Sequence, residues 1–327
     1  MNRDIELYQP VVENALPLWF NNATAQLLNV SENIMYCVDT DDGSRYVLRV
    51  HRQNNNIRAI KSELSWVNAL QADGVLRTPD VIPGRNGKTI QSVVDPVDGS
   101  KLFLVMFAFI EGREPSDGDD VLEQFYNLGE LAARTHNHSM TWSPPADFKR
   151  PAWNTNTLLG DNPLWGYWQD GPGVDKTNFA TLQLLCNTVK QRLNNLGMDR
   201  SVFGLIHADM RRANLLIQDN ATRLIDFDDC GFGWYLYDFA TAVSFIEDHP
   251  QLPQLKSSWL DGYRKWRVPS ELEIQELDTL IMLRRLALLA WMGGHAEVPI
   301  VQELQGKFAS ITCQLAQEYL ATPNTDA

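Results

Sequence analysis

Three polar side chains at fixed spacing in the second half of the chain have the chemistry that phosphoryl transfer needs. Asp209, Asn214 and Asp226 lie between His207 and Phe227, where apolar runs alternate with polar residues. This pattern predicts a strand, a polar loop, a strand, a tight turn and a third strand, so that the three side chains gather around one point. Hard divalent cations prefer oxygen ligands, which the amide of Asn214 and the carboxylate of Asp226 supply.

Asp209 is placed to act on an attacking hydroxyl. In transfer from Mg·ATP the protein positions the reactants and neutralises charge, and one carboxylate accepts or orients the proton of the hydroxyl. Asn214 follows Asp209 by five residues, the offset in the kinase sequence H-R-D-x-x-x-x-N, and Asp226 takes the place of the acid that opens D-F-G. Arg211 stands where kinases place a cation to neutralise the transferred phosphate. We therefore expect ATP, or else GTP, and Mg²⁺ as cofactors.

The chain resembles the superfamily of aminoglycoside phosphotransferases, choline kinases and type II homoserine kinases. Two motifs carry this resemblance: His207-x-Asp209-x4-Asn214 and Ile225-Asp226-Phe227-Asp228-Asp229. It implies a protein-kinase-like α+β fold with two lobes. A five-stranded antiparallel sheet and a helix form the N-terminal lobe (1–111), the hinge lies near 106–112, and a larger, mainly helical lobe follows (112–327). The alternative is an acidic turn between two strands, with no catalytic role.

The resemblance also assigns supporting roles around the motif. In the family an acid at the position of Asp238 holds the catalytic loop by hydrogen bonds, so Asp238 and His207 are expected to be structural. Asp228 is expected to approach the metal or the substrate. As an alternative, Asp228 is a solvated acid of the turn.

A pair of opposite charges in the first lobe is the second feature typical of kinases. Strands are predicted at 25–30, 33–39 and 45–51, followed by a helix that contains Glu63. Arg49 takes the place of the lysine that pairs the nucleotide phosphates, and Glu63 that of its partner acid. Because arginine binds phosphate with two donors and keeps its charge, the departure from lysine bears on nucleotide affinity. The alternative is a surface ion pair.

Two further segments are expected to meet the nucleotide. The turn after the first strand contains no glycine, but Ser31 and the backbone amides can still meet phosphate oxygens; an ordinary hairpin is the alternative. The resemblance places the hinge at 106–110, where the backbone around Phe107 and Phe109 would hold the purine edge. A plain buried strand would be compatible with that role.

Aromatic and basic side chains mark two more places. Trp153 and Trp168, in the proline-punctuated stretch 144–172, are candidates to cradle a cationic or flat substrate; alternatively, they join a long loop to the core. Arg284 and Arg285 lie in an apolar helix, where each charge must find a partner. That partner is an anionic group of the substrate or an acid of the core.

The charge balance narrows the class of partners. The 327 residues carry a formal net charge of −13, from 28 basic and 41 acidic side chains, which argues against nucleic acid or an anionic membrane as the main partner. The balance agrees with a cationic small substrate and equally with simple solubility. The longest apolar stretch is interrupted by two arginines, so no membrane span is expected. The charged start and four unpaired cysteines predict a cytoplasmic protein, monomeric or homodimeric.

The spacing of the acids favours a small acceptor. Protein kinases need a long segment between the D-F-G acid and the next structural acid, but Asp226 and Asp238 are twelve residues apart and no Ala-Pro-Glu follows. The leading hypothesis is an ATP-dependent kinase acting on a hydroxyl of a small metabolite: an amino alcohol, a hydroxy amino acid such as homoserine, or an aminoglycoside-like compound. A Ser/Thr protein kinase of the bacterial stress-response type and a non-catalytic nucleotide-binding regulator are the alternatives.

Hydrophobic periodicity predicts the remaining elements. Two more strands are expected in the first lobe, at 89–95 and 102–107, after a loop over 75–83. Helices are expected, in chain order, at 4–20 (broken), 119–138, 176–196, 238–247, 252–266, 270–292 and 298–320.

Overall fold

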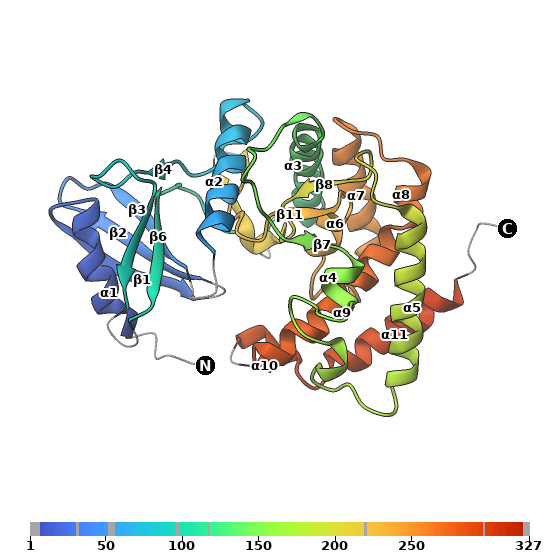
Figure 1. Ribbon diagram of the computed structural model, residues 1–327. Coiled ribbons are helices and arrows are strands. Elements are labelled where there is room, and N and C mark those ends of the chain that lie inside the picture. Colours follow the sequence, from blue (N-terminus) through green and yellow to red (C-terminus); the bar gives the residue numbers. More distant parts are fainter. Residues whose placement is uncertain are drawn as a thin grey trace. The chain divides into compact units, whose positions relative to one another are not determined.

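The computed structural model describes residues 7–30, 33–51, 56–95, 99–116, 118–218, 221–296 and 298–322 (Figure 1). Contacts among these residues divide the chain into two compact units. The first unit contains the chain up to Gln71, Arg77–Gly112 and Pro144–Lys149, and the second contains Ala72–Leu76, Arg113–Ser143 and the chain from Arg150 onward. The arginine predicted to pair the nucleotide belongs to the first unit, and the catalytic motif belongs to the second.

The first unit is built on an antiparallel sheet, which has six strands among the described residues. The strand order is β1 (Ala23–Val30), β2 (Ile34–Thr40), β3 (Arg45–Val50), β6 (Lys101–Ala108) and β4 (Val81–Ile82), and β5 (Ile90–Val94) also pairs with β6. The predicted number of five strands is wrong by one, because β4 lies in the stretch expected as a loop. A strand of two residues has no periodicity to detect, and only its pairing with Phe107 and Met106 reveals it.

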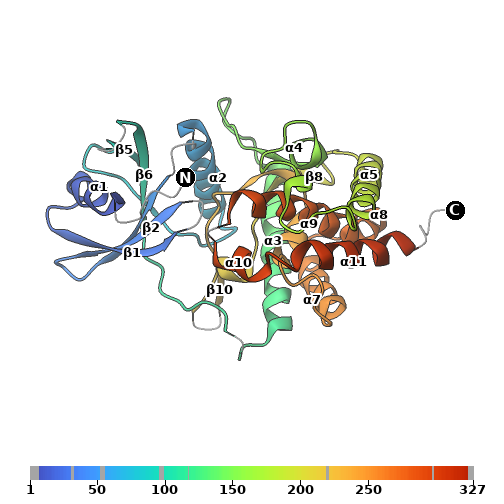
Figure 2. The ribbon, with the colours of Figure 1, turned by 90° about the horizontal axis from the view of Figure 1, so that it is seen from below.

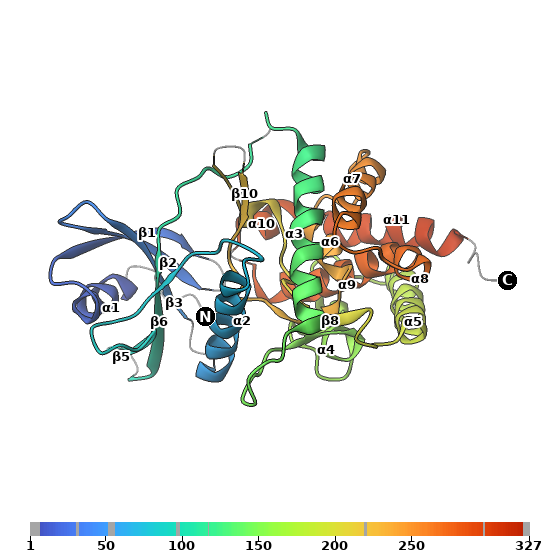
Figure 3. The ribbon, with the colours of Figure 1, turned by 90° about the horizontal axis from the view of Figure 1, so that it is seen from above.

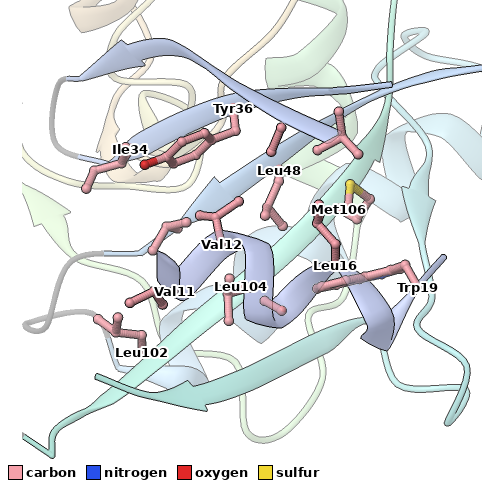
Figure 4. Packing of buried hydrophobic residues seen from close by; sticks show 14 residues of the cluster. Val11, Val12, Leu16, Trp19, Ile34, Tyr36, Leu48, Leu102, Leu104 and Met106 are labelled. Carbon is pink, nitrogen blue, oxygen red and sulfur yellow. The ribbon is translucent and has the colours of Figure 1, made fainter. Parts of the chain in front are cut away.

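Helix α1 (Tyr8–Ala15) covers one face of this sheet (Figure 4). Alternate residues of β2 point to that face, so Ile34, Tyr36 and Val38 are buried and their neighbours are more exposed. A short 3-10 helix, η2 (Leu16–Leu18), continues the cover. The core between helix and sheet also contains Val11, Val12, Trp19, Leu48, Val50, Leu102, Leu104 and Met106.

Helix α2 (Ile57–Ala72) lies on the opposite face of the sheet (Figure 2). Its Leu64 packs in a cluster with Val105 and Phe107 of β6. Side chains alternate along a strand, so Arg49 of β3 points to the α2 face while its two neighbours point to the α1 core. The sheet therefore places this arginine beside the helix that carries the predicted partner acid.

The second unit is mainly helical (Figure 3). Its helices are α3 (Val121–Thr141), α4 (Thr155–Leu159), α5 (Phe179–Leu196), α6 (Tyr237–Ala242), α7 (Leu252–Arg264), α8 (Glu271–Gln275), α9 (Leu277–Gly294), α10 (Pro299–Leu304) and α11 (Phe308–Ala321), with short 3-10 turns η3 (Trp168–Asp170) and η4 (Arg212–Asn214). Two predicted helices are divided: 270–292 at Glu276 and 298–320 near Gly306. Glycine lowers helix propensity, which accounts for the second break, whereas the break at Glu276 coincides with its ion pair to Arg192.

Two small sheets carry the catalytic stretch. Strands β8 (Phe203–Ile206) and β11 (Gly231–Trp234) pair antiparallel, and β7 (Ala152–Trp153) pairs parallel with β11. Strands β9 (Leu215–Gln218) and β10 (Ala221–Leu224) pair antiparallel. The predicted strand, polar loop and two further strands are confirmed, while the residues predicted as the tight turn, 219–220, lie outside the described residues.

Helix α9 runs through the interior of the second unit. Nearly all of its side chains are buried, and it contacts α5, α6 and α11. Its two arginines, Arg284 and Arg285, therefore lie where a charge needs a partner. Among the described residues, no helix combines the length and apolar character that a membrane crossing requires.

Candidate active site

The loop between β8 and β9 brings three of the predicted residues together. Asp209 is buried, with 8% of its surface exposed. The side-chain amide of Asn214 donates to the Asp209 carbonyl (2.7 Å) and to its Oδ2 (2.9 Å). Arg211 donates from Nε to Oδ1 (2.8 Å) and from Nη2 to Oδ2 (3.0 Å), the two-point geometry that guanidinium and carboxylate favour. Near neighbours in the sequence thus hold the carboxylate in one orientation.

A third donor reaches Asp209 from helix α9, and the sequence did not reveal it. Nη2 of Arg284 lies 3.2 Å from Asp209 Oδ1, and its Nε donates to Ser244 Oγ (3.0 Å). The sequence indicated that Arg284 needs a partner, but it offered no means to choose among the acids. Its neighbour Arg285 forms a separate buried pair with Glu247 (2.7 Å).

The Asp209 carboxylate remains ionised in this setting. Burial acts to raise its pKa, but the charges of Arg211 and Arg284 and the hydrogen bond from Arg211 outweigh burial and hold the pKa below its ordinary value. A carboxylate with a low pKa is a weak base. It is therefore suited to orient a hydroxyl and to accept its proton as the new bond to phosphorus forms.

Asp238 holds the backbone of this loop. Its Oδ2 accepts from the backbone N–H of His207 (3.1 Å), and its Oδ1 accepts from that of Ala208 (2.7 Å). Ala208 has φ 65°, a left-handed conformation that an alanine adopts only under tertiary constraint. His136 of α3 lies 2.9 Å from Asp238 Oδ2 and 2.8 Å from Tyr263 Oη. Burial lowers the pKa of His136, so a neutral imidazole completes the support.

Asp226 joins the site through the backbone beside it. The N–H of Ile225 donates to the Asn214 carbonyl (3.0 Å), and the Ile225 carbonyl lies 3.1 Å from His207 Nε2. Asp226 itself is exposed and has φ 62°. The negative charge of Asp226 also acts on Arg211: the pKa of Arg211 is raised mainly by Asp209 and to a smaller extent by Asp226.

The donor set fits a divalent cation that is shared with a phosphate ligand. The Asn214 amide uses its nitrogen on Asp209, and among the described residues no hydrogen bond involves its oxygen. No cluster of three His, Cys, Asp or Glu side chains suited to a metal occurs in the described part of the chain. Mg²⁺ typically takes one or two protein oxygens together with waters and substrate phosphates. Asn214 and Asp226 can supply the protein share.

Two residues that the catalytic motif does not include hold the turn that follows Asp226. Arg150 donates from Nε to the Cys230 carbonyl (2.5 Å) and from Nη2 to the Asp228 carbonyl. Trp153 donates from its indole nitrogen to the Asp229 carbonyl (2.7 Å). Trp153 is itself buried, so its position fits the alternative in which the aromatic stretch is joined to the core. Nothing in the sequence around Arg150 singled it out.

The other candidate substrate residues differ in exposure. Trp168 is buried in η3 and packs against Phe179, with ring centroids 5.5 Å apart. Asp228 and Asp229 are half-buried. Burial, together with the charges of Asp209 and Asp228, raises the pKa of Asp229 well above its ordinary value. The acidic side chains that follow Asp226 therefore lie close enough to one another to repel electrostatically.

In the first unit, Arg49 and Glu63 form the pair that the sequence predicts. Nη2 of Arg49 lies 2.8 Å from Glu63 Oε1, and the pair is buried, which excludes the alternative of a surface ion pair. The Phe107 ring lies against the guanidinium, 4.8 Å from its centroid. Phe107 thus contributes its side chain to the arginine's environment.

Two other segments, the turn with Ser31 and the hinge at 106–110, were predicted to meet the nucleotide. Ser31 lies outside the described residues. In the hinge segment, the backbone N–H of Ala108 donates to the backbone carbonyl of Asp80 (2.8 Å), and that of Phe109 donates to the backbone carbonyl of Arg45 (3.2 Å). These two N–H groups are bonded within the unit, so a purine here would use other backbone groups of 106–110.

The chain matches a family along most of its length. Residues 24–272 match the phosphotransferase enzyme family. The chain belongs to this family. It is 25% identical over 275 residues to the amicoumacin kinase of Bacillus subtilis (strain 168), a match that covers 83% of this chain and 77% of that protein.

Solved structures share the fold. A microcompartment-associated aminopropanol kinase is 40% identical, with a TM-score of 0.88, and the match covers 95% of this chain and 97% of that one. Amicoumacin kinase in complex with AMP-PNP, Ca²⁺ and Ami is 19% identical, with a TM-score of 0.78 and coverages of 95% and 94%. Spectinomycin phosphotransferase in complex with ADP and spectinomycin is 14% identical, with a TM-score of 0.65 and coverages of 94% and 97%. The predicted protein-kinase-like α+β fold and the predicted class of small-molecule phosphotransferase are confirmed.

Proposed function

We propose that this protein transfers the γ-phosphate of ATP to the hydroxyl of a small amino alcohol, with Mg²⁺ as the metal. The observation that carries the proposal is the buried, ionised Asp209, held by Arg211, Asn214 and Arg284. The 40% identity to an aminopropanol kinase over 95% of the chain favours an amino alcohol over a hydroxy amino acid or an aminoglycoside-like acceptor.

The residues of the second unit divide the work as follows. Asp209 orients the acceptor hydroxyl and takes the proton of that hydroxyl. The low pKa of Asp209 suits a loose transition state, in which bond formation to the nucleophile lags behind cleavage of the bond to the leaving group. Arg211 stabilises the charge of the phosphoryl group in transfer. Asn214 and Asp226 hold Mg²⁺, which supplies charge neutralisation to the phosphates when bound.

In the first unit, Arg49 is assigned to the phosphates of the nucleotide. Glu63 fixes the direction of the guanidinium through its 2.8 Å contact, and the Phe107 ring limits its movement. An arginine fixed in this way loses little rotamer freedom when phosphate binds. ATP is the assigned donor, with GTP as the other outcome of a nucleotide panel.

Two variants test the assignment. Asp209→Asn should keep Mg·ATP binding and lose turnover by about 10²–10⁴-fold, the usual contribution of a positioned base. Asp226→Ala should instead abolish the Mg²⁺-dependent part of nucleotide binding. The turnover of Asp209→Asn is measured by coupled ADP release with 1-amino-2-propanol, homoserine and amino sugars. The nucleotide binding of Asp226→Ala is measured by calorimetric titration of Mg·ATP. Near-normal turnover in Asp209→Asn, or unchanged titration in Asp226→Ala, would refute the corresponding role.

Several expectations remain predictions from the sequence. These are the exclusion of nucleic acid as a partner, the cytoplasmic location, the monomeric or homodimeric state, and the alternatives of a Ser/Thr protein kinase and a non-catalytic regulator. Transfer of labelled phosphate to proteins of a lysate, in preference to the amino-alcohol panel, would favour the protein kinase.

A further inference from the structure

Three buried polar residues at a spacing of three follow one side of α6 and the turn after it. They are Asp238, Thr241 and Ser244. Residues three apart are neighbours on a helix surface, and the N–H of Ser244 donates to the Thr241 carbonyl (3.1 Å), which continues this arrangement past the end of the helix. Asp238 holds the backbone before Asp209. The other two side chains also reach the surroundings of Asp209, and the sequence did not single them out.

The Thr241 hydroxyl binds the backbone that follows Asp209. Its Oγ1 accepts from the N–H of Met210 (3.0 Å) and donates to the Asp238 carbonyl of its own helix (2.9 Å). A hydroxyl has one hydrogen, and the helix carbonyl takes it, so Thr241 meets the loop as an acceptor. Met210 and Thr241 are both fully buried. Removal of this oxygen would therefore take the acceptor from a buried N–H, which is costly.

The peptide between Asp209 and Met210 is held on both sides. Its N–H is bonded to Thr241, and its carbonyl accepts from the side-chain amide of Asn214 (2.7 Å) and from the N–H of Arg211 (2.8 Å). A peptide unit is planar and contains the preceding Cα, so bonds on both sides fix the plane from which the Asp209 side chain projects. The Thr241 hydroxyl thus acts on the direction of the catalytic carboxylate.

The Ser244 hydroxyl holds the arginine that reaches Asp209 from α9. It accepts from Arg284 Nε (3.0 Å), while Arg284 Nη2 lies 3.2 Å from Asp209 Oδ1. The guanidinium is a rigid plane, so a bond at Nε fixes the direction in which Nη2 donates. An arginine side chain has many rotamers, and ordering it has an entropic cost. Ser244 favours the rotamer that contacts the catalytic carboxylate.

We propose that Thr241 and Ser244 are positioning residues for phosphoryl transfer. Thr241 acts through the peptide between residues 209 and 210, and Ser244 acts through Arg284. The inference rests on the proposed role of Asp209. The rate of transfer depends on how well the acceptor hydroxyl is aligned with phosphorus, and a small misplacement of the group that orients it lowers that rate. Loss of either hydroxyl should therefore lower kcat and leave nucleotide affinity in place.

Thr241→Val tests the first contact, because valine keeps the shape of threonine and removes the oxygen. With the acceptor that the wild type phosphorylates fastest in the amino-alcohol panel, kcat should fall about 5- to 100-fold. The KM for ATP should stay within about threefold. Thr241→Ser restores the hydroxyl and should return kcat to within about threefold of the wild type.

Thr135→Val is the matched control for Thr241→Val. Thr135 is equally buried, but its hydroxyl donates to the Leu131 and Ala132 carbonyls of its own helix, α3. This variant should keep the kcat of the wild type. In all variants kcat is expressed per nucleotide site, counted by calorimetric titration of Mg·ATP, so that unfolded protein does not contribute. A kcat per site in Thr241→Val equal to that in Thr135→Val, or no recovery in Thr241→Ser, would overturn the role of Thr241.

A double-mutant cycle tests whether Ser244 acts through Arg284. Ser244→Ala should lower kcat about 3- to 10-fold in the wild-type background. In the Arg284→Met background it should lower kcat less than about twofold, because the group that Ser244 orients is then absent. Equal factors in the two backgrounds, or no loss in the wild-type background, would overturn the role of Ser244.

Asp209→Asn, measured in parallel, separates this inference from the proposed function. Near-normal turnover in Asp209→Asn would refute the role of Asp209 and, with it, the inference. A large loss of turnover in Asp209→Asn, with none in Thr241→Val or Ser244→Ala, would refute the inference alone.

Discussion

Replacing Arg284 by methionine isolates the contact that joins helix α9 to the catalytic loop. Methionine approximates the aliphatic stem of the arginine but removes the guanidinium that lies 3.2 Å from Asp209 Oδ1. At that separation, and with an effective dielectric of about 20, the attraction between the charges is about 5 kcal/mol before desolvation. Asp209 keeps its two-point contact with Arg211, so the change does not leave a buried carboxylate unpaired.

The expected loss is therefore smaller than the full attraction. A hydrogen bond to a charged group typically contributes about 1.5–3 kcal/mol, which corresponds to roughly 10- to 150-fold in kcat if the contact orients Asp209 in the transition state. The unfolding free energy should change little, because the desolvation cost of burying Arg284 disappears along with its attraction. The KM for ATP should remain within about threefold, because the contact is with Asp209, which acts on the acceptor hydroxyl and not on the nucleotide.

Arg285→Met is the matched control, because it removes the neighbouring buried arginine of the same helix. Burial already raises the pKa of its partner Glu247, and without Arg285 that acid has lost its ion pair. Breaking such a pair costs about 3–5 kcal/mol of stability. Steady-state kinetics and urea unfolding of both variants separate the two effects. A kcat within threefold of wild type in Arg284→Met, or the same stability loss in both variants, would refute the reasoning.

Two further predictions concern the supporting pairs. Glu63→Gln should raise the KM for ATP about 10-fold or more and leave acceptor binding unchanged, because Arg49 loses the charge that fixes it; an unaltered KM would contradict this. Burial lowers the pKa of His136 below its ordinary value near 6.5. The unfolded chain therefore binds a proton first as the pH falls, so the unfolding free energy is complete above about pH 6.5 and decreases below it. Urea unfolding at pH 7.5 and 5.5 should show a smaller pH dependence in His136→Asn, and an identical dependence would exclude the role.

The part of the site that the sequence predicted is the part made by short-range contacts. Arg211 and Asn214 lie two and five residues from Asp209, and the tight loop between β8 and β9 brings them onto one carboxylate. The alternation along β3 likewise put Arg49 on one face of a strand, opposite a helix with an acid. In both cases the local geometry leaves few other arrangements.

Segments with a weak periodic signal were predicted less well. The two-residue strand β4 exists because Val81 and Ile82 meet the edge of β6, and no pattern of two residues indicates that. Helix periodicity continued across Glu276 and across Gly306, although the backbone leaves the helix at both places. An apolar stripe predicts which face is buried, but it does not show where a helix ends.

The sequence by itself determined the chemistry: the residue types, the offsets within the motif, the buried arginines that must find acids, and the family these features resemble. Only the tertiary structure decided which acid each arginine meets. Arg284 reaches Asp209 across 75 residues of chain, and Arg150 and Trp153 bind carbonyls of a turn that follows them by 76 to 80 residues. Such pairings depend on how α9 and the β7 segment pack against the catalytic loop. Packing is a property of the whole folded unit, so no local pattern in the chain encodes it.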